Sequence, residues 1–135
     1  MSRQIFVNLP VADVPASAAF YEGLGFGRNE QFSTDQAVSI VVSDSITLIL
    51  LERDYFATFT PKPVGEPRKT TSVTVALSAE SRGEVDDLAE RAMQTGASTA
   101  NPPQDHGFMY GRSFFDLDGH QVELVWMDTA AMPLP

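Results

Sequence analysis

Residues 116–124 read Asp116-Leu117-Asp118-Gly119-His120-Gln121-Val122-Glu123-Leu124, a polar stretch that passes into an alternating one. Aspartate and glycine are common in tight turns, and alternation of apolar with polar residues is typical of a strand with one buried face. We therefore predict a turn at 116–119 that joins strands at 109–115 and 120–127. Asp116 and Asp118 are too few to form a calcium-binding loop.

The segment before this hairpin predicts a strand, a helix and a further strand. Residues 72–77 are strand-like, and Ser81 with Glu84 has the spacing of a capping box. The apolar residues that follow recur at helical spacing: Val85, Leu88, Ala89, Ala92 and Met93. Gly96 marks the end of this helix, and residues 97–100 form the next predicted strand.

The first half of the chain predicts the same order of elements. Residues 5–9 form a short strand-like run, and Asp13 has the features of a helix N-cap, with Pro15 in the first turn. Gly25 ends this helix. Three further strands are predicted at 26–32, 37–42 and 46–52.

The chain is thus predicted to be one domain, residues 1–135, made of two architecturally similar halves. Module one spans 1–59 and module two spans 71–135. The linker at 60–70 contains three prolines, which disfavour regular structure. The two modules share little residue identity, so the repeat is one of architecture rather than of sequence.

The composition excludes several classes of protein. There are 18 acidic and 9 basic residues, a formal net charge of -9, and no cysteine. The acidic balance argues against nucleic-acid binding, and the lack of cysteine excludes disulfides and zinc fingers. No apolar run approaches the roughly 20 residues of a membrane helix, and no secretory signal is recognisable. We expect a soluble cytoplasmic protein.

Two stretches carry a resemblance to a known family. Residues 6–13 (Phe6-Val7-Asn8-Leu9-Pro10-Val11-Ala12-Asp13), with 17–21 and 23–26 after them, look like the opening of the vicinal oxygen chelate superfamily, and 116–124 resembles its closing hairpin. This superfamily includes glyoxalase I, bleomycin resistance proteins and extradiol dioxygenases. The resemblance implies an α+β fold of two βαβββ modules that form a cupped mixed sheet, with the active cavity in the cup. It also implies a homodimer.

Metal-dependent members of the superfamily hold one divalent ion with about four ligands, usually His and Glu. Carried onto this chain, the four ligand positions fall at Phe6, at Leu50 or Glu52, at Ser72 or Thr74, and at Glu123. Only the two carboxylates can coordinate well, and an imidazole-rich site needs nitrogen donors.

We therefore expect no cofactor and no family-type metal site. The fallback metal ligands are Glu52 and Glu123. Asn8 shares a face with Phe6 and could offer an amide oxygen, so a divalent metal in a shifted site stays open. The two histidines, His106 and His120, are at none of the family's ligand positions.

Glu123 is the first candidate catalytic residue. If it points into the cup without a metal, desolvation should raise its pKa, and it could act as a general base beside a carbonyl. Alternatively it hydrogen-bonds to Asn8, Thr74 or a water and only fixes the cavity.

The segment 104–112 is the second candidate, because it combines an imidazole, a phenol and a guanidinium with two glycines. His106 could shuttle a proton, and Arg112 could pair with an anionic substrate or with Glu123. In the ordinary interpretation the glycines shape a turn, Phe108 fills the core and Arg112 makes a structural ion pair.

Aromatic and polar side chains predicted to line the ligand site complete the set. They are Phe6, Asn8, Phe56, Phe59, Phe108, Tyr110, Arg112 and Trp126. A helical turn at 54–59 could cover the cup. Each aromatic taken alone is also compatible with a place in the core.

These observations favour a protein that binds a small organic ligand in a metal-free cup. The acidic charge would suit a cationic ligand. The alternative is a lyase, isomerase or dioxygenase that acts on a small carbonyl or aromatic substrate, with Glu123 as base or metal ligand.

Overall fold

The structure is a computed structural model that describes residues 3–130. The chain divides into two compact units, Met1–Pro67 and Arg68–Pro135, and each is considered by itself. The boundary between the units lies within the proline-containing segment 60–70. Within residues 3–130, no helix is long and apolar enough to cross a membrane.

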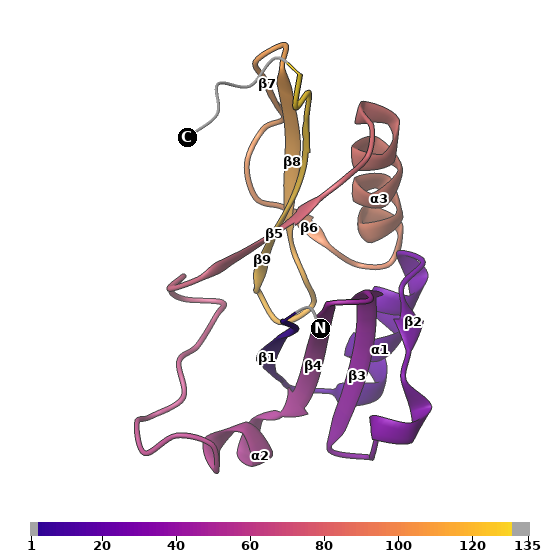
Figure 1. Cartoon of the computed structure of the whole chain (residues 1–135). Coiled ribbons are helices and arrows are strands. Elements are labelled where there is room, and N and C mark those ends of the chain that lie inside the picture. Colours follow the sequence, from indigo (N-terminus) through magenta and orange to yellow (C-terminus); the bar gives the residue numbers. More distant parts are fainter. Residues whose placement is uncertain (1–2, 131–135) are drawn as a thin grey trace. The chain divides into compact units, whose positions relative to one another are not determined.

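The first unit is a four-stranded sheet with one long helix (Figure 1). Its elements are β1 (Ile5–Val11), α1 (Val14–Gly23), β2 (Gly27–Arg28), the 3-10 helix η1 (Glu30–Phe32), β3 (Ala37–Ser43), β4 (Ile46–Glu52) and α2 (Arg53–Ala57). The strand order is β1-β4-β3-β2, with β1 parallel to β4 and the other pairs antiparallel.

The second unit repeats this plan. Its elements are β5 (Thr74–Ser78), α3 (Arg82–Gln94), β6 (Ser98–Thr99), β7 (Gln104–Asp105), β8 (Met109–Phe115) and β9 (Gln121–Met127). The order is β5-β9-β8-β6, with β5 parallel to β9 and β7 paired with β8. Two mixed sheets of βαβββ-like modules confirm the predicted α+β class.

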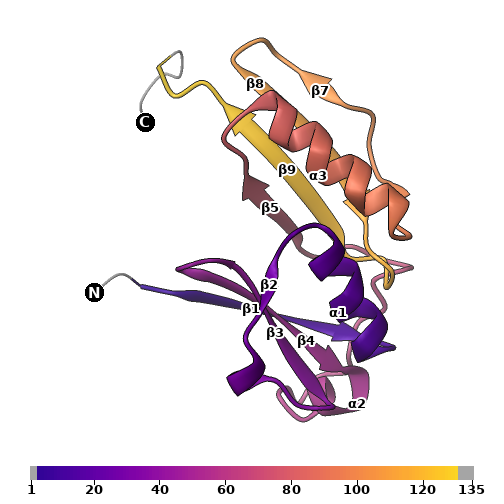
Figure 2. The same cartoon turned by 90° about the vertical axis from the view of Figure 1, so that its right-hand side faces the viewer.

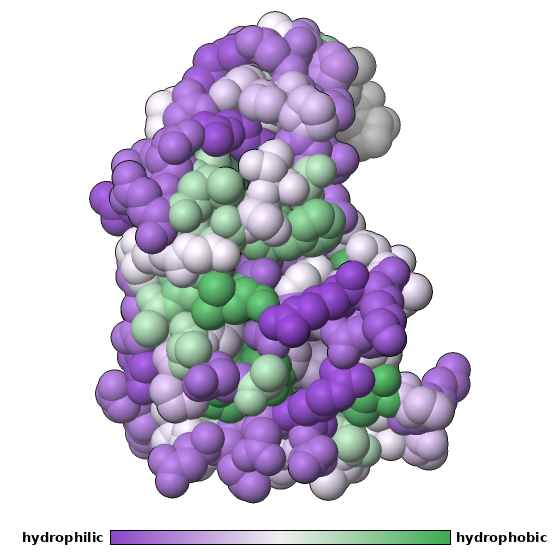
Figure 3. Space-filling view, turned by 180° about the vertical axis from the view of Figure 1, so that it is seen from behind, coloured by the Kyte–Doolittle hydropathy of each residue, from purple (hydrophilic) through white to green (hydrophobic). Residues whose placement is uncertain are grey.

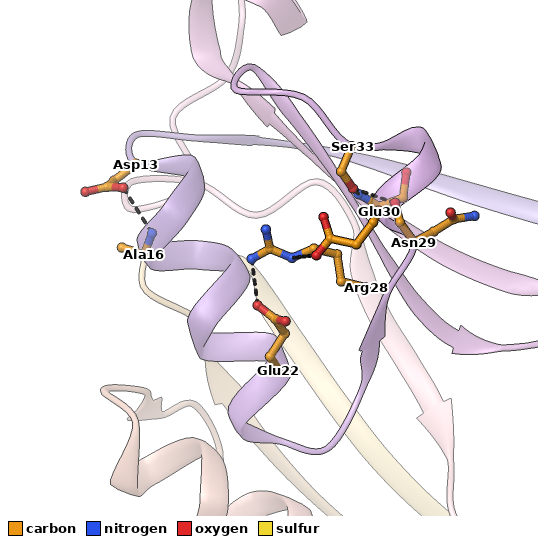
Figure 4. A network of polar contacts seen from close by, with 8 residues as sticks. Asp13, Ala16, Glu22, Arg28, Asn29, Glu30 and Ser33 are labelled. Carbon is orange, nitrogen blue, oxygen red and sulfur yellow. Dashed lines mark hydrogen bonds and ion pairs between the residues drawn. The ribbon is translucent and has the colours of Figure 1, made fainter.

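The helices begin and end where the sequence indicates. Asp13 caps α1, because its Oδ1 accepts a hydrogen bond from the Ala16 N–H at 3.0 Å (Figure 4). Ser81 caps α3 in the same way, with its Oγ accepting from the Glu84 N–H at 3.0 Å. Gly25 and Gly96 follow the two helices with φ of 102° and 114°, a conformation that favours glycine.

Each sheet buries one face under its long helix (Figure 2). In the first unit α1 covers the face that carries Leu9, Val11, Val38, Ile40, Leu48 and Leu50. In the second unit α3 places Val85, Ala89 and Ala92 against the face that carries Leu77, Phe114, Val122 and Leu124. The opposite face of each sheet is therefore not part of its own unit's helix-covered core.

The predicted strand at 26–32 is mostly wrong. Only β2 forms there, and η1 follows it, because side chains compete with the strand for backbone groups. Ser33 Oγ donates to the Asn29 carbonyl at 2.7 Å, and Ser39 Oγ donates to the Phe32 carbonyl at 2.9 Å. The short strand β7 was not predicted, because its two polar residues show no apolar alternation.

A charged contact joins β2 to α1. Arg28 Nη2 lies 2.7 Å from Glu22 Oε1, and Figure 4 shows the guanidinium between Glu22 and Glu30. The hydrogen bond that Arg28 donates to the Glu22 carboxylate raises the pKa of Arg28. Since the short β2 makes few ladder bonds, this contact helps to hold it beside the helix.

Candidate functional site

Glu123 lies on the face of the second sheet that α3 does not cover. Its neighbours in the chain, Val122 and Leu124, are buried on the α3 side. Because successive side chains of a strand point to opposite faces, Glu123 projects from the other face. It pairs with Ser113 of β8 and Ala76 of β5, which share that face. We call this the open face of the second sheet.

The open face contains a hollow of about 150 Å³. It is formed by β7, β8, β9 and the segment before β7, and side chains that border it include Asn101, Gln104, Met109, Ser113, Glu123 and Val125. Gly111 also borders it and pairs with Val125. Arg112 and Leu124 alternate to the α3 side, so they border the hollow with main-chain atoms.

The Glu123 carboxylate is partly buried and has no partner in the described part of the chain. No hydrogen bond or salt bridge joins it to any residue from 3 to 130, Thr74 included. Desolvating a carboxylate without a compensating contact is costly. The oxygen atoms of Glu123 are therefore available to a ligand or to solvent in the hollow.

The predicted ligand residues Tyr110 and Arg112 lie on the opposite face from Glu123. Arg112 bridges two acidic residues of α3, with Nη1 at 3.2 Å from Asp86 Oδ1 and Nη2 at 2.8 Å from Glu90 Oε1. The Tyr110 hydroxyl donates to Asp86 Oδ1 at 2.6 Å. This hydrogen bond lowers the pKa of Asp86 and raises that of Tyr110. The pairing of Arg112 with Glu123 does not form, because strand alternation separates the two side chains.

Trp126 belongs to the same α3-side network. The Arg82 guanidinium carbon lies 5.1 Å from the Tyr110 ring centroid and 5.2 Å from that of Trp126. Arg82 also donates to both carboxylate oxygens of Asp105 at 2.9 Å and to the Gly107 carbonyl at 2.8 Å. These contacts fasten the β7–β8 hairpin to α3.

His106 and Phe108 lie at the tip of the β7–β8 hairpin. Both are exposed, Phe108 by 43%, so Phe108 does not fill the core. Met109 at the start of β8 is four positions from Ser113, the strand partner of Glu123. That separation is about 13 Å along the strand at 3.3 Å per residue. His106 and Glu123 are therefore not placed to act on one proton.

The candidate residues of the first unit lie at separate places in its fold. Phe6 and Asn8 are on the face of β1 opposite α1, and Phe6 is 55% exposed. Phe56 is in α2, and Phe59 beyond it is 54% exposed and packs edge-to-face with Tyr55 at 5.2 Å. Figure 3 shows a surface on which hydrophobic residues lie among hydrophilic ones.

The fallback ligand Glu52 is on the helix side of the first sheet. It pairs with Val11 and shares a face with Leu48 and Leu50, which α1 covers. Phe6 and Asn8 alternate to the opposite face. The register thus separates Glu52 from the positions with which it was expected to converge.

The residues present do not fit the metal site of the family that the sequence resembles. Phe6 has no donor atom, and the β5 residues beside Glu123 are Thr74 and Ala76, which supply no nitrogen ligand. Among residues 3–130, no three His, Asp or Glu side chains gather as a metal site would require.

A model of the Glyoxalase/Bleomycin resistance protein/Dioxygenase superfamily matches residues 3–124, nearly the whole chain. The chain belongs to this superfamily. The match includes both stretches of sequence on which the resemblance rested, at the start and near the end of the chain, and it ends just after Glu123. A search of curated proteins gives no match.

Solved structures of the superfamily fold are similar over almost their full length. A hypothetical protein from S. aureus is 28% identical with a TM-score of 0.78, covering 93% of this chain and 94% of that one. A glyoxalase-related enzyme from Fulvimarina pelagi is 21% identical with a TM-score of 0.79, covering 100% and 94%. An antibiotic binding protein from Streptomyces is 19% identical with a TM-score of 0.66, covering 94% and 97%.

Sequence reasoning placed Gly111 in the predicted strand 109–115 but considered it only as part of a turn, so its link to the hollow was missed. Gly111 lies within β8, and a side chain there would extend toward Val125 and reduce the hollow. A single glycine inside a strand pattern often marks a place where something approaches closely. That signal was present between Tyr110 and Arg112.

Acid should release the β7–β8 hairpin from α3. Arg82 and the Gly107 N–H lower the pKa of the Asp105 carboxyl from 3.8 to about 2. Because the folded pKa is the lower one, the contact stabilises fully above about pH 4 and is lost as the pH falls through 2. We expect the Gly107 amide resonance, which reports its bond to Asp105, to titrate with a midpoint near 2.

Asp105→Asn should abolish this titration and speed hydrogen exchange in β7, whereas Asp44→Asn in an exposed turn should leave both unchanged. A Gly107 midpoint near 4 would show that Arg82 does not hold Asp105.

Arg112→Gln should lower the free energy of unfolding by about 1 kcal/mol, because charged hydrogen bonds to Asp86 and Glu90 are lost from a partly exposed site. Lys62→Gln in the exposed linker is the control, with an expected change within about 0.5 kcal/mol. Urea unfolding measures both. Equal stability of the two variants would contradict a structural role for Arg112.

Proposed function

We propose that this protein binds a small organic ligand, without a metal, in the hollow beside Glu123. The observation that carries the proposal is a partly buried carboxylate that has no partner among residues 3–130 and borders a hollow of about 150 Å³. The donor set does not fit the family's divalent metal, which favours direct binding of an organic molecule. The Streptomyces antibiotic binding protein of the same fold supports small-molecule binding as a use of this architecture.

The hollow has the composition of a small-molecule site. Met109 and Val125 supply apolar walls, and Gln104 and Asn101 supply amide groups at the rim. Ligand sites are commonly apolar with a few polar groups that fix orientation. A volume of about 150 Å³ is enough for a group the size of benzene. Methionine adapts its shape to such groups at little cost.

The expected homodimer stays a prediction. Ile5 and Phe6 are each 55% exposed on β1, which is an edge strand of the first sheet. Exposed apolar residues on an unpaired strand edge favour association with a second chain. Sedimentation equilibrium should give a mass near twice 14.7 kDa, and a monomer mass at micromolar concentration would contradict the dimer.

Filling the hollow should abolish ligand binding. A Cβ at Gly111 would meet the Leu124 carbonyl oxygen at 3.4 Å and Val125 Cγ2 at 3.8 Å, so a side chain fits the strand. We expect Gly111→Val to fold and to occupy the space that a ring would take. The matched control is Gly27→Val, another strand glycine, where a Cβ meets nothing within 4 Å.

The measurement is thermal unfolding with single-ring probes: benzyl alcohol, phenol, benzylammonium, imidazole and benzoate. At ten times its Kd, a bound probe should stabilise the native protein by about 1.4 kcal/mol, which raises Tm by a few degrees. The wild type and Gly27→Val should show this shift with at least one probe, and Gly111→Val should not. An equal shift in Gly111→Val would place binding elsewhere.

A further inference from the structure

We propose that the ligand of this hollow is an organic monocation with a ring-sized apolar body, held by the Glu123 carboxylate. This rests on the proposed function and names its ligand class. The geometry that carries it is the distribution of charge over the two faces of the second sheet, where the basic side chains Arg82 and Arg112 lie on the α3 side, away from the hollow.

Glu123 is the one ionisable side chain among the described residues that faces the hollow. The other charged residue bordering it, Arg112, has its guanidinium on the α3 side, bound to Asp86 and Glu90. Arg82 is likewise held on that side by Asp105. Neither cation can turn to neutralise Glu123 without breaking these contacts and passing through the sheet.

The rest of the open face supplies no substitute cation. Its strand residues in the described part of β5, β8 and β9 are Thr74, Ala76, Ser78, Met109, Gly111, Ser113, Phe115, Gln121, Val125 and Met127. None is basic. No basic strand residue of this face therefore offsets the charge of Glu123, and the net charge of -9 adds to its negative potential.

A carboxylate can only accept hydrogen bonds, so it selects groups that donate them. A cationic donor such as an ammonium or amidinium gains both charge and hydrogen bonds there, whereas an anion is repelled. A neutral ring fills the same space but leaves the carboxylate without a partner. The hollow should therefore rank ligands in the order cation, neutral, anion.

An organic cation fits this site better than a metal ion does. Calcium and magnesium take six or more oxygen ligands, and several protein oxygens must converge on them. Here a single carboxylate faces the hollow, the other bordering side-chain oxygens are the neutral ones of Asn101, Gln104 and Ser113, and Met109 and Val125 supply apolar walls. These apolar walls suit the hydrocarbon part of an organic ligand.

The test compares three single-ring probes of similar size and different charge: benzylammonium, benzyl alcohol and benzoate. Their Kd values are measured by NMR titration of the amide resonances of Gly111, Ser113 and Val125. In the wild type we expect benzylammonium to bind at least tenfold more tightly than benzyl alcohol, and benzoate to bind more weakly still.

Glu123→Gln keeps the size of the side chain and removes its charge, so the preference for benzylammonium over benzyl alcohol should fall from tenfold to about one. Asp44→Asn removes one negative charge from an exposed turn of the first unit and should keep the tenfold preference. Unchanged amide resonances of α3 in Glu123→Gln would establish that this variant is folded.

The outcomes separate the two proposals. If benzyl alcohol binds at the hollow as tightly as benzylammonium, the cation preference is overturned and the proposed function stands. If the preference survives in Glu123→Gln, a different group provides the charge and the assignment to Glu123 is overturned. If no probe shifts the resonances of the hollow, both proposals fail.

Discussion

The alternation of side chains along β9 is the constraint on which the site depends. Val122 and Leu124 must face α3 to complete the core of the second unit, and both are almost fully buried. Glu123 lies between them, so it is forced to the opposite face whatever its own preference. Moving Glu123 to the α3 side would require a one-residue shift of register, which would expose both apolar neighbours. The packing of the core thus holds in position a carboxylate that has no partner among residues 3–130.

The same constraint divides the second unit into a face whose contacts stabilise the fold and a face on which we propose that the ligand binds. On the α3 side the two arginines form ion pairs: Arg112 contacts Asp86 and Glu90, and Arg82 contacts Asp105. These contacts attach the β7–β8 hairpin to the helix. On the open side no basic residue of β5, β8 or β9 shares the face of Glu123.

Much of the fold could be predicted from the sequence because its signals are local. The caps at Asp13 and Ser81 and the glycines after both helices depend on neighbours only a few residues away. The predicted strand at 26–32 was mostly wrong, because two of its backbone carbonyls accept hydrogen bonds from the side chains of Ser33 and Ser39. Strand propensity alone does not include such bonds.

The faces of the candidate residues were harder to predict, because they depend on pairing between strands. Glu52 and Leu50 share a face as alternation requires, but only the register shows that this is the face under α1. For Tyr110 and Arg112 the strand sequence was ambiguous, because Phe114 and Phe115 are both large and apolar but point to opposite faces of β8. The structure buries Phe114, which places Tyr110 and Arg112 on the α3 side.

The most direct test of this account is the place where a bound probe touches the protein. Intermolecular nuclear Overhauser effects can be recorded between the ring protons of benzylammonium and the methyl groups of the protein. The account predicts contacts with the methyl groups of Met109 and Val125, which border the hollow beside Glu123. Contacts confined to Trp126 on the α3 side, or to Phe6 in the first unit, would contradict it.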